Sequence, residues 1–207
     1  MTAIPTHDRN TRDARAQLLD AALTVIREKG FSATSVDDLC QTAGVTKGAF
    51  FHHFRSKEDF GVDVVDYWSQ TTDAFFADAA YHDLADPLQR LLGYIDLRTE
   101  LLHGGVSEFT CLVGTMVQEV YDTSPTIRAA CEASIRGHAA RLETDIAEAM
   151  LRHGVRGDWT AGDLALHIQA VLQGAFILAK ATGNVDVARL SVGHLRRYIA
   201  LLFDQPS

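Results

Sequence analysis

The chain has 207 residues, 47% of them hydrophobic, which is enough to bury the core of one large domain or of two smaller ones. Its 19 basic and 27 acidic residues give a formal net charge of −8, which argues against nucleic-acid binding over the whole surface. Its three widely spaced cysteines, Cys40, Cys111 and Cys131, argue against a disulfide framework and against a zinc knuckle.

The negative charge is unevenly distributed along the chain. Residues 1–60 carry eight basic and eight acidic side chains, so the entire net charge lies after residue 60. An acidic body would repel DNA and leave the neutral first part to engage it. The sequence has no run of about 18 or more apolar residues and begins with the polar stretch MTAIPTHDRNTRD, so we expect neither a membrane span nor a signal peptide, and a cytoplasmic protein.

The first predicted element is a helix from about Thr11 to Lys29, with apolar residues on one stripe and Gly30 as its stop. Residues 35–59, SVDDLCQTAGVTKGAFFHHFRSKED, then predict two short helices joined by a tight turn, and the start of a third. Ser35 begins a capping box for the first of these helices, and Thr46 is placed to cap the second. This layout is typical of a helix-turn-helix, whose second helix enters the DNA major groove.

The run TKGAFFHHFRSKEDF, residues 46–60, closely resembles the recognition-helix signature of the TetR family of bacterial one-component repressors. The resemblance covers about Arg12–Val64 at the motif level, and elsewhere only the general layout of an all-helical chain of this length. Phe51 departs from the family, which usually carries a tyrosine there whose hydroxyl reaches a backbone phosphate. The resemblance implies a DNA-binding domain over residues 1–56 and a helical effector-sensing and dimerisation domain over residues 57–207.

Base-edge and phosphate contacts are expected from the second helix of the motif and from its flanks. Gly48 and Ala49 let the backbone approach the groove closely, and Lys47 and Lys57 are donors for phosphate or guanine. Helix N-termini such as the one at Ser35 suit a phosphate. The alternative is that these residues are merely exposed polar groups. For His53 the alternative is that it only caps the end of its helix. The predicted DNA-binding residues are Ser35, Thr46, Lys47, Gly48, Ala49, Phe51, His52, His53 and Lys57.

The rest of the chain predicts helices only, because no strand-like alternation is present. Capping boxes at Ser56 and Thr160, and Asp-Pro or Ser-Pro pairs at residues 86–87 and 124–125, indicate where helices begin. We therefore predict an all-α fold of about nine helices, with three in the N-terminal domain, residues 1–56, and six in the body, residues 57–207. The body helices are expected near residues 57–80, 86–103, 107–121, 124–152, 160–181 and 186–203.

Two body segments, TCLVGTMVQEVYDTSPTIR and GAFILAKATG, look like those of a TetR-type subgroup that senses electrophiles and reactive oxidants. In that subgroup a cysteine of the first segment lies beside a lysine of the second, and the matching residues here are Cys111 and Lys180. A nearby ammonium favours the thiolate, which is the reactive species. The alternative is that Cys111 is a small core residue and that Lys180 reaches the surface along its apolar stem.

Bulky side chains of the body are candidates for lining an effector cavity. The resemblance implies such a cavity, because the C-terminal domain of the family commonly carries one and releases DNA when it is filled. Taken singly, each of these residues is more often part of a core than of a ligand pocket. The candidates are Trp68, Phe75, Tyr94, Phe109, Met116, Tyr121, His138 and Phe176.

The last two predicted helices are apolar over much of their circumference. In the family these two helices pair with their copies to form a four-helix dimer interface, and a two-fold dimer would present its recognition helices to successive major grooves about 34 Å apart. The alternative is that the two helices only close the core of one monomer.

We therefore predict a sequence-specific DNA-binding transcriptional regulator, a homodimeric repressor released from a palindromic operator by a small-molecule or thiol-reactive effector. The sequence carries no Gly-rich phosphate loop, no nucleophile elbow, no H-E-x-x-H motif and no paired-carboxylate signature. We accordingly predict no enzymatic activity, no cofactor and no metal site. The alternative is a helical protein-interaction module or small-molecule binder that does not bind DNA.

Overall fold

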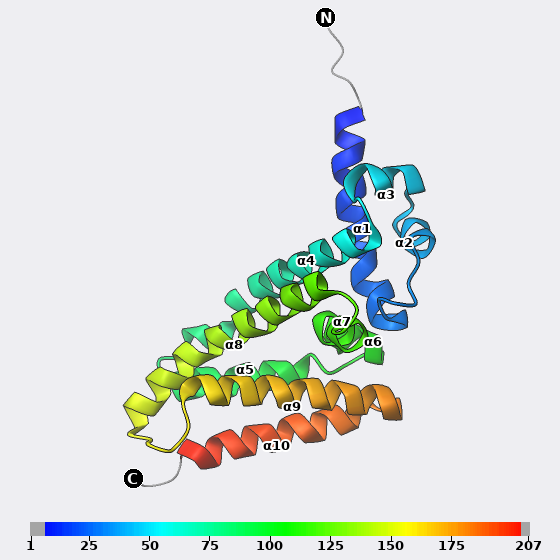
Figure 1. The fold of residues 1–207 in the computed structure, drawn as a ribbon. Coiled ribbons are helices and arrows are strands. Elements are labelled where there is room, and N and C mark those ends of the chain that lie inside the picture. The colour runs from blue at the N-terminus through cyan, green and yellow to red at the C-terminus, as the bar shows by residue number, and fades with distance from the viewer. Residues whose placement is uncertain (1–6, 204–207) are drawn as a thin grey trace, which may run out of the picture. The chain divides into compact units, whose positions relative to one another are not determined.

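The computed structural model describes residues 7–203, and over that range its regular elements are all helices, with no strand (Figure 1), which confirms the predicted all-α class. It contains ten α-helices and one short 3-10 helix, η1, where about nine helices were predicted. The elements are α1 (His7–Lys29), α2 (Val36–Ala43), α3 (Lys47–His53), α4 (Lys57–Ala77), η1 (Ala80–Asp83), α5 (Pro87–Glu100), α6 (Val106–Phe109), α7 (Leu112–Val120), α8 (Pro125–His153), α9 (Ala161–Thr182) and α10 (Val185–Phe203).

The described chain folds into two compact units that are not continuous in sequence. Unit 1 comprises residues 7–70 and 112–132, and unit 2 comprises residues 71–111 and 133–203. The chain passes from one unit to the other within α4, between α6 and α7, and within α8. The predicted division at residues 56 and 57 concerns which residues bind DNA and which bind an effector, and it stays a prediction.

Unit 1 is built around side chains from α1, α2, α3, α4, α7 and the start of α8. Each helix contributes at least one apolar residue that is no more than 1% exposed, and burying one large apolar side chain contributes about 1.5–3 kcal/mol. Among the most deeply buried are Leu18, Ala22, Ile26, Leu39, Phe50, Phe54, Phe60, Val64, Leu112, Met116 and Ile127.

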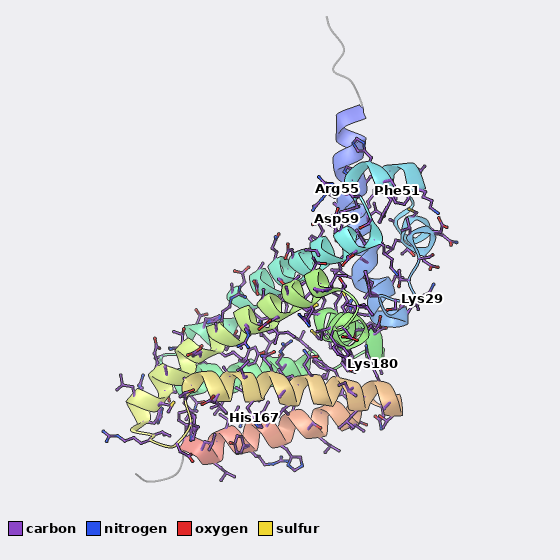
Figure 2. The ribbon with its side chains drawn as sticks, in the orientation of Figure 1. Lys29, Phe51, Arg55, Asp59, His167 and Lys180 are labelled. Atoms are coloured by element: carbon purple, nitrogen blue, oxygen red, sulfur yellow. The ribbon has the colours of Figure 1, made fainter. Side chains whose placement is uncertain are left out.

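Local capping fixes where the short helices of unit 1 begin and end. The Ser35 hydroxyl accepts the Asp38 N–H at 3.0 Å, and the Asp38 carboxylate accepts the Ser35 N–H at 2.9 Å, so the predicted capping box of α2 is present. Gly44 ends α2 with φ +67°, in the left-handed region that glycine adopts most readily. Before α4, the Ser56 hydroxyl accepts the N–H of Asp59, which is labelled in Figure 2, at 3.0 Å.

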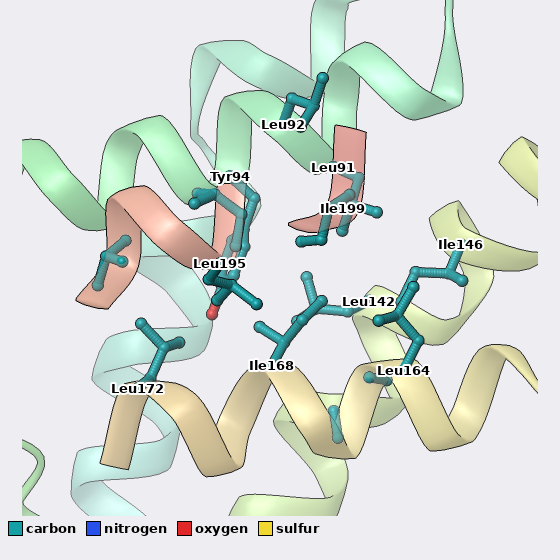
Figure 3. Packing of buried hydrophobic residues seen from close by; sticks show 14 of the residues in the cluster. Leu91, Leu92, Tyr94, Leu142, Ile146, Leu164, Ile168, Leu172, Leu195 and Ile199 are labelled. Carbon is teal, nitrogen blue, oxygen red and sulfur yellow. The ribbon is translucent and has the colours of Figure 1, made fainter. Parts of the chain in front are cut away.

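Unit 2 holds its own core between α5, α8, α9 and α10. Figure 3 shows Leu164, Ile168 and Leu172 of α9 pointing into this core together with Leu195 and Ile199 of α10. By length and hydropathy α9 is the one described helix that could cross a membrane. Its buried side chains belong to the unit 2 core, which accounts for part of its apolar composition.

The helix predicted over residues 107–121 is two helices, α6 and α7, and this part of the prediction is wrong. Thr110 adopts extended dihedral angles, φ −79° and ψ 154°, and its side chain is only 1% exposed. No glycine or proline marks the break, and a β-branched residue has only slightly lowered helix propensity. The interruption coincides with a buried residue, and sequence periodicity does not reveal it.

Candidate functional site

Helix α3 is fixed at both ends and on one face, and its other face is open. The Thr46 hydroxyl caps its first turn by accepting the Ala49 N–H at 3.1 Å, and Phe54 ends it in an extended conformation. Phe50, which is fully buried, packs against the rings of Phe54 and Phe60 with centroids 5.3 and 5.2 Å away. The neighbouring Phe51 is 52% exposed (Figure 2). One aromatic residue therefore anchors the helix and the next is presented to solvent.

The structure gathers seven of the nine predicted DNA-binding residues on α3 and its cap. The other two, Ser35 and Lys57, lie at the beginnings of α2 and α4. Six of the nine residues are exposed, whereas Ala49, His53 and Lys57 are half-buried. Their contacts with DNA stay a prediction, and the residues with exposed positions are Ser35, Thr46, Lys47, Gly48, Phe51 and His52.

Lys47, at the start of α3, forms an exposed ion pair with Asp37 of α2. Its Nζ lies 2.9 Å from Asp37 Oδ1, and the two side chains are 56% and 72% exposed. Such an exposed ion pair stabilises a protein by about 0–1 kcal/mol. The Lys47 ammonium can therefore leave Asp37 and bind a phosphate with little loss of free energy.

Two predicted residues already hold contacts within unit 1. Ser35 serves in the capping box, and hydrogen bonds from its backbone and side chain, with one from Lys29, hold the pKa of Asp38 well below its ordinary value. The Lys57 ammonium donates to the Ser32 carbonyl at 3.2 Å and lies 4.6 Å from the centre of the Phe31 ring. Burial lowers the pKa of Lys57, with Glu119 and Asp38 opposing it.

His53 ends α3 in a half-buried position beside Phe54, with the ring centroids 6.2 Å apart. Its Nε2 atom is buried and has no hydrogen-bond partner among the described residues. The alternative interpretation of His53 as a helix-end cap therefore gains no support from this nitrogen.

Sequence reasoning missed a set of contacts that hold the N-terminal helices to α7 and the start of α8 within unit 1. Glu119 of α7 accepts the Ser32 N–H at 2.7 Å, and Glu58 of α4 accepts the hydroxyls of Ser124 and Thr126 at 2.5 and 2.8 Å. These hydrogen bonds lower the pKa of Glu58. The partners lie 66 to 87 residues apart in the chain, and no local signal announces them.

The two predicted sensor residues both belong to unit 2. Cys111 lies in the break between α6 and α7, half-buried against the unit 2 core. Lys180 lies in the last turn of α9 and is exposed (Figure 2). Cys40 and Cys131 are buried, in agreement with a packing role.

The predicted effector-lining residues fall into separate places. Trp68, Met116 and Tyr121 belong to unit 1, where Met116 is fully buried and Tyr121 is 60% exposed. In unit 2, the rings of Phe109 and Phe176 lie 6.3 Å apart, and the Tyr94 hydroxyl is 2.9 Å from His138 Nε2. The role of these eight residues in lining an effector cavity stays a prediction.

Unit 2 contains a cavity of about 610 Å³ between α4, η1, α5 and α8, which includes Tyr94 and His138. A second cavity, of about 420 Å³, takes in Phe75. Most residues of the larger cavity were not predicted, because segments far apart in sequence supply them. Its lining comprises Asp73, Ala74, Phe76, Ala77, Tyr81, His82, Tyr94, His138, Arg141, Leu142, Thr144 and Asp145.

Comparison with known proteins gives two family matches. Residues 18–61 match bacterial regulatory proteins of the tetR family, and residues 87–190 match the C-terminal domain of LmrA/YxaF-like transcriptional regulators. The transcriptional repressor NemR of Escherichia coli K12 is 29% identical over 199 residues, which cover 91% of this chain and 94% of NemR. The transcriptional regulator AcuR of Cereibacter sphaeroides is 30% identical over 171 residues, which cover 81% of this chain and 76% of AcuR.

Solved structures agree with these matches. The reduced form of Escherichia coli NemR superposes with a TM-score of 0.78 at 24% identity, covering 89% of this chain and 96% of that one. A regulatory protein TetR from Rhodobacter sphaeroides superposes with a TM-score of 0.77 at 26% identity, covering 89% of this chain and 97% of the other.

Proposed function

The chain belongs to the TetR family of bacterial transcriptional regulators, and from that premise we propose that it binds its operator through α3 and leaves it when a thiol-reactive compound modifies Cys111. Family membership makes it a DNA-binding transcriptional repressor under the control of a small-molecule effector. The residues that read DNA and the class of effector are the proposed parts. We also propose that it has no catalytic activity and works in the cytoplasm, in keeping with relatives that are transcriptional regulators.

The DNA-binding proposal rests on one observation: one face of α3 is buried and the other is exposed. Phe50 is fully buried and holds the helix in place, whereas Lys47, Phe51 and His52 are exposed on the segment that matches the family model. A short helix held this way can enter a major groove without rearranging the core.

A homodimer through α9 and α10 is the proposed assembly. Each of these helices buries one face in the unit 2 core and still exposes large apolar side chains, a pattern typical of a surface that a second copy covers. Two copies would also double the number of phosphate contacts. This matters because the N-terminal segment of one copy has no net charge and attracts DNA only modestly. The exposed apolar residues are Leu166, Ile177 and Leu178 on α9 and Leu190, Tyr198 and Leu201 on α10.

Lys47→Ala tests the role of α3. We expect the variant to bind a palindromic duplex from upstream of the protein's own gene about tenfold more weakly. The slope of log affinity against log salt concentration should become shallower by about one unit per subunit, because one phosphate contact is lost. Fluorescence anisotropy over a series of salt concentrations measures both. The matched control is Lys29→Ala, which removes an exposed ammonium of unit 1 that pairs with Asp38 and lies outside α3. Equal losses in the two variants would reject the proposed role of Lys47, and absence of sequence-dependent binding by the wild type would reject the regulator itself.

Cys111→Ser tests the effector class. N-ethylmaleimide adds to a thiolate through a new sulfur–carbon bond, and the adjacent carbon takes up a proton, so one equivalent adds 1:1. We expect the reagent to release wild-type protein from DNA and to leave the Cys111→Ser variant bound. Cys131→Ser, at a fully buried position, should behave as the wild type does. Lys180→Ala should slow the modification of Cys111 severalfold if the ammonium favours the thiolate. Release of the Cys111→Ser variant at the wild-type rate would exclude this cysteine as the sensor.

A further inference from the structure

The turn between α1 and α2, residues 30–35, is held from outside by two charged side chains. Glu119 of α7 accepts the Ser32 N–H at 2.7 Å, and the ammonium of Lys57, at the start of α4, donates to the Ser32 carbonyl at 3.2 Å. All these residues belong to unit 1, in which α7 packs against α1 (Figure 1). Both backbone polar groups of one exposed turn residue are therefore bound by side chains of opposite charge.

Gly30, which follows the last residue of α1, leaves the space that Glu119 occupies. A Cβ atom at Gly30 would overlap with the Glu119 carboxylate, at 2.9 Å from Cδ. The φ angle of Gly30 is +87°, in the left-handed region, so the backbone and the neighbouring carboxylate both favour glycine here. Glu119 therefore lies directly against the backbone at the point where the chain leaves α1.

The rest of the turn carries the position of Ser32 to the start of α2. Thr34 is 1% exposed, and its hydroxyl donates to the Gly30 carbonyl at 2.6 Å, which closes the turn on itself. The next residue, Ser35, forms the capping box with Asp38. Only two residues separate Ser32 from this cap, so a displacement of Ser32 would move the first turn of α2.

The position of α2 matters for DNA binding, because the first helix of a helix-turn-helix crosses the DNA backbone while the second enters the groove. Helix α2 also contacts α3, and Asp37 of α2 forms the ion pair with Lys47 of α3. A shift of α2 would therefore change the surface that both helices present.

We propose that Glu119 is a positioning residue for DNA binding, which fixes the α1–α2 turn through the Ser32 N–H and thereby sets the position of α2 without touching DNA. The inference rests on the proposed function, because it concerns the surface that binds the operator. The alternative is that Phe31, which is 7% exposed, anchors the turn by itself and makes the carboxylate dispensable.

The direction of the effect on affinity separates positioning from charge. Glu119 is acidic, so its removal lowers the repulsion between the protein and the DNA phosphates, and electrostatics alone predicts tighter binding. A positioning role predicts weaker binding. It also predicts an unchanged salt dependence, because no phosphate contact is lost.

Glu119→Ala removes the acceptor of the Ser32 N–H. We expect this variant to bind the palindromic operator duplex about fivefold more weakly than the wild type, with the same slope of log affinity against log salt concentration. Glu119→Gln keeps a carbonyl oxygen as acceptor and should recover most of the affinity. Fluorescence anisotropy over a series of salt concentrations measures both quantities, and thermal unfolding establishes that each variant is folded.

The matched control is Glu58→Ala. It removes another carboxylate of unit 1, one that accepts the hydroxyls of Ser124 and Thr126 and makes no contact with the α1–α2 turn through them. We expect this variant to lose hydrogen bonds of the same kind and yet to bind the operator at least as tightly as the wild type.

Amide hydrogen exchange, followed by NMR on the full-length protein without DNA, tests the turn directly. We expect the Ser32 N–H to exchange severalfold faster in Glu119→Ala than in the wild type, and at the wild-type rate in Glu58→Ala.

Wild-type affinity in Glu119→Ala, equal losses in Glu119→Ala and Glu58→Ala, or equal losses in Glu119→Ala and Glu119→Gln would each overturn the proposal. Absence of operator binding by the wild type would instead reject the proposed function. The exchange rates, which need no DNA, would then still decide whether Glu119 holds the turn.

Discussion

Replacement of Phe50 by alanine is expected to lower the free energy of unfolding of unit 1 by about 3–5 kcal/mol, the range for a buried phenylalanine. Phe50 is fully buried, and the rings of Phe51, Phe54 and Phe60 lie 5.2 to 5.3 Å from its own. Its loss leaves a cavity under α3, a helix of seven residues that cannot stand alone. Urea denaturation followed by Trp68 fluorescence, in a Trp159→Phe background that leaves one tryptophan in the chain, reports on unit 1.

The neighbouring residue supplies the control, because Phe51→Ala removes the same ring from a position that is 52% exposed. We expect that variant to unfold within about 0.5 kcal/mol of the wild type and yet to bind DNA more weakly. Equal destabilisation by the two substitutions would show that α3 is not anchored through Phe50.

Gly61→Val in α4 is expected to destabilise unit 1 by about 3 kcal/mol, through overpacking. A Cβ atom at Gly61 would lie 2.8 Å from Phe31 Cζ and 2.9 Å from Ile127 Cδ1. Phe31 is 7% exposed and Ile127 is fully buried, so neither can move aside freely. The gain from replacing a helical glycine, about 1 kcal/mol or less, does not offset this clash. The same urea titration measures the change.

Gly137→Val in α8 is the matched control for Gly61→Val. It is also a helical glycine, but a Cβ atom there would meet nothing within 4 Å. Because Gly137 belongs to unit 2, this pair of variants is followed by far-ultraviolet circular dichroism, and we expect the unfolding midpoint of Gly137→Val to stay at or slightly above that of the wild type. A similar loss in both variants would indicate that the effect comes from the β-branched side chain in a helix and not from the space around Gly61.

The sequence predicted the helices well wherever their limits depend on residues three or four positions apart. The capping boxes at Ser35 and Thr160 are present as predicted, because each needs only a hydroxyl and a carboxylate at fixed spacing. The break at Thr110 escaped prediction, because neither a glycine nor a proline marks it in the sequence. Local signals indicate where most helices begin, and this break carries none.

The same distinction separates the two candidate sites. The α3 surface is contiguous in sequence, so a motif of 15 residues, 46–60, was enough to locate it. The cavity beside His138 draws on residues 73 to 145, and no spacing rule links Phe76 or Arg141 to it. Tyr94 and His138 were identified only as bulky body residues, and their hydrogen bond emerges from the fold.

The discontinuity of unit 1 limits how the protein can be recombined with its relatives. A fragment that ends at residue 56 leaves behind Leu112, Met116 and Ile127, all fully buried, and with them the carboxylate of Glu119 that holds the Ser32 N–H. Chimaeras that exchange operator preference between family members must therefore transplant residues 112–132 along with the N-terminal helices. Divergence in residues 112–132 is constrained by the interior of unit 1, even though this segment follows Cys111 directly in the chain.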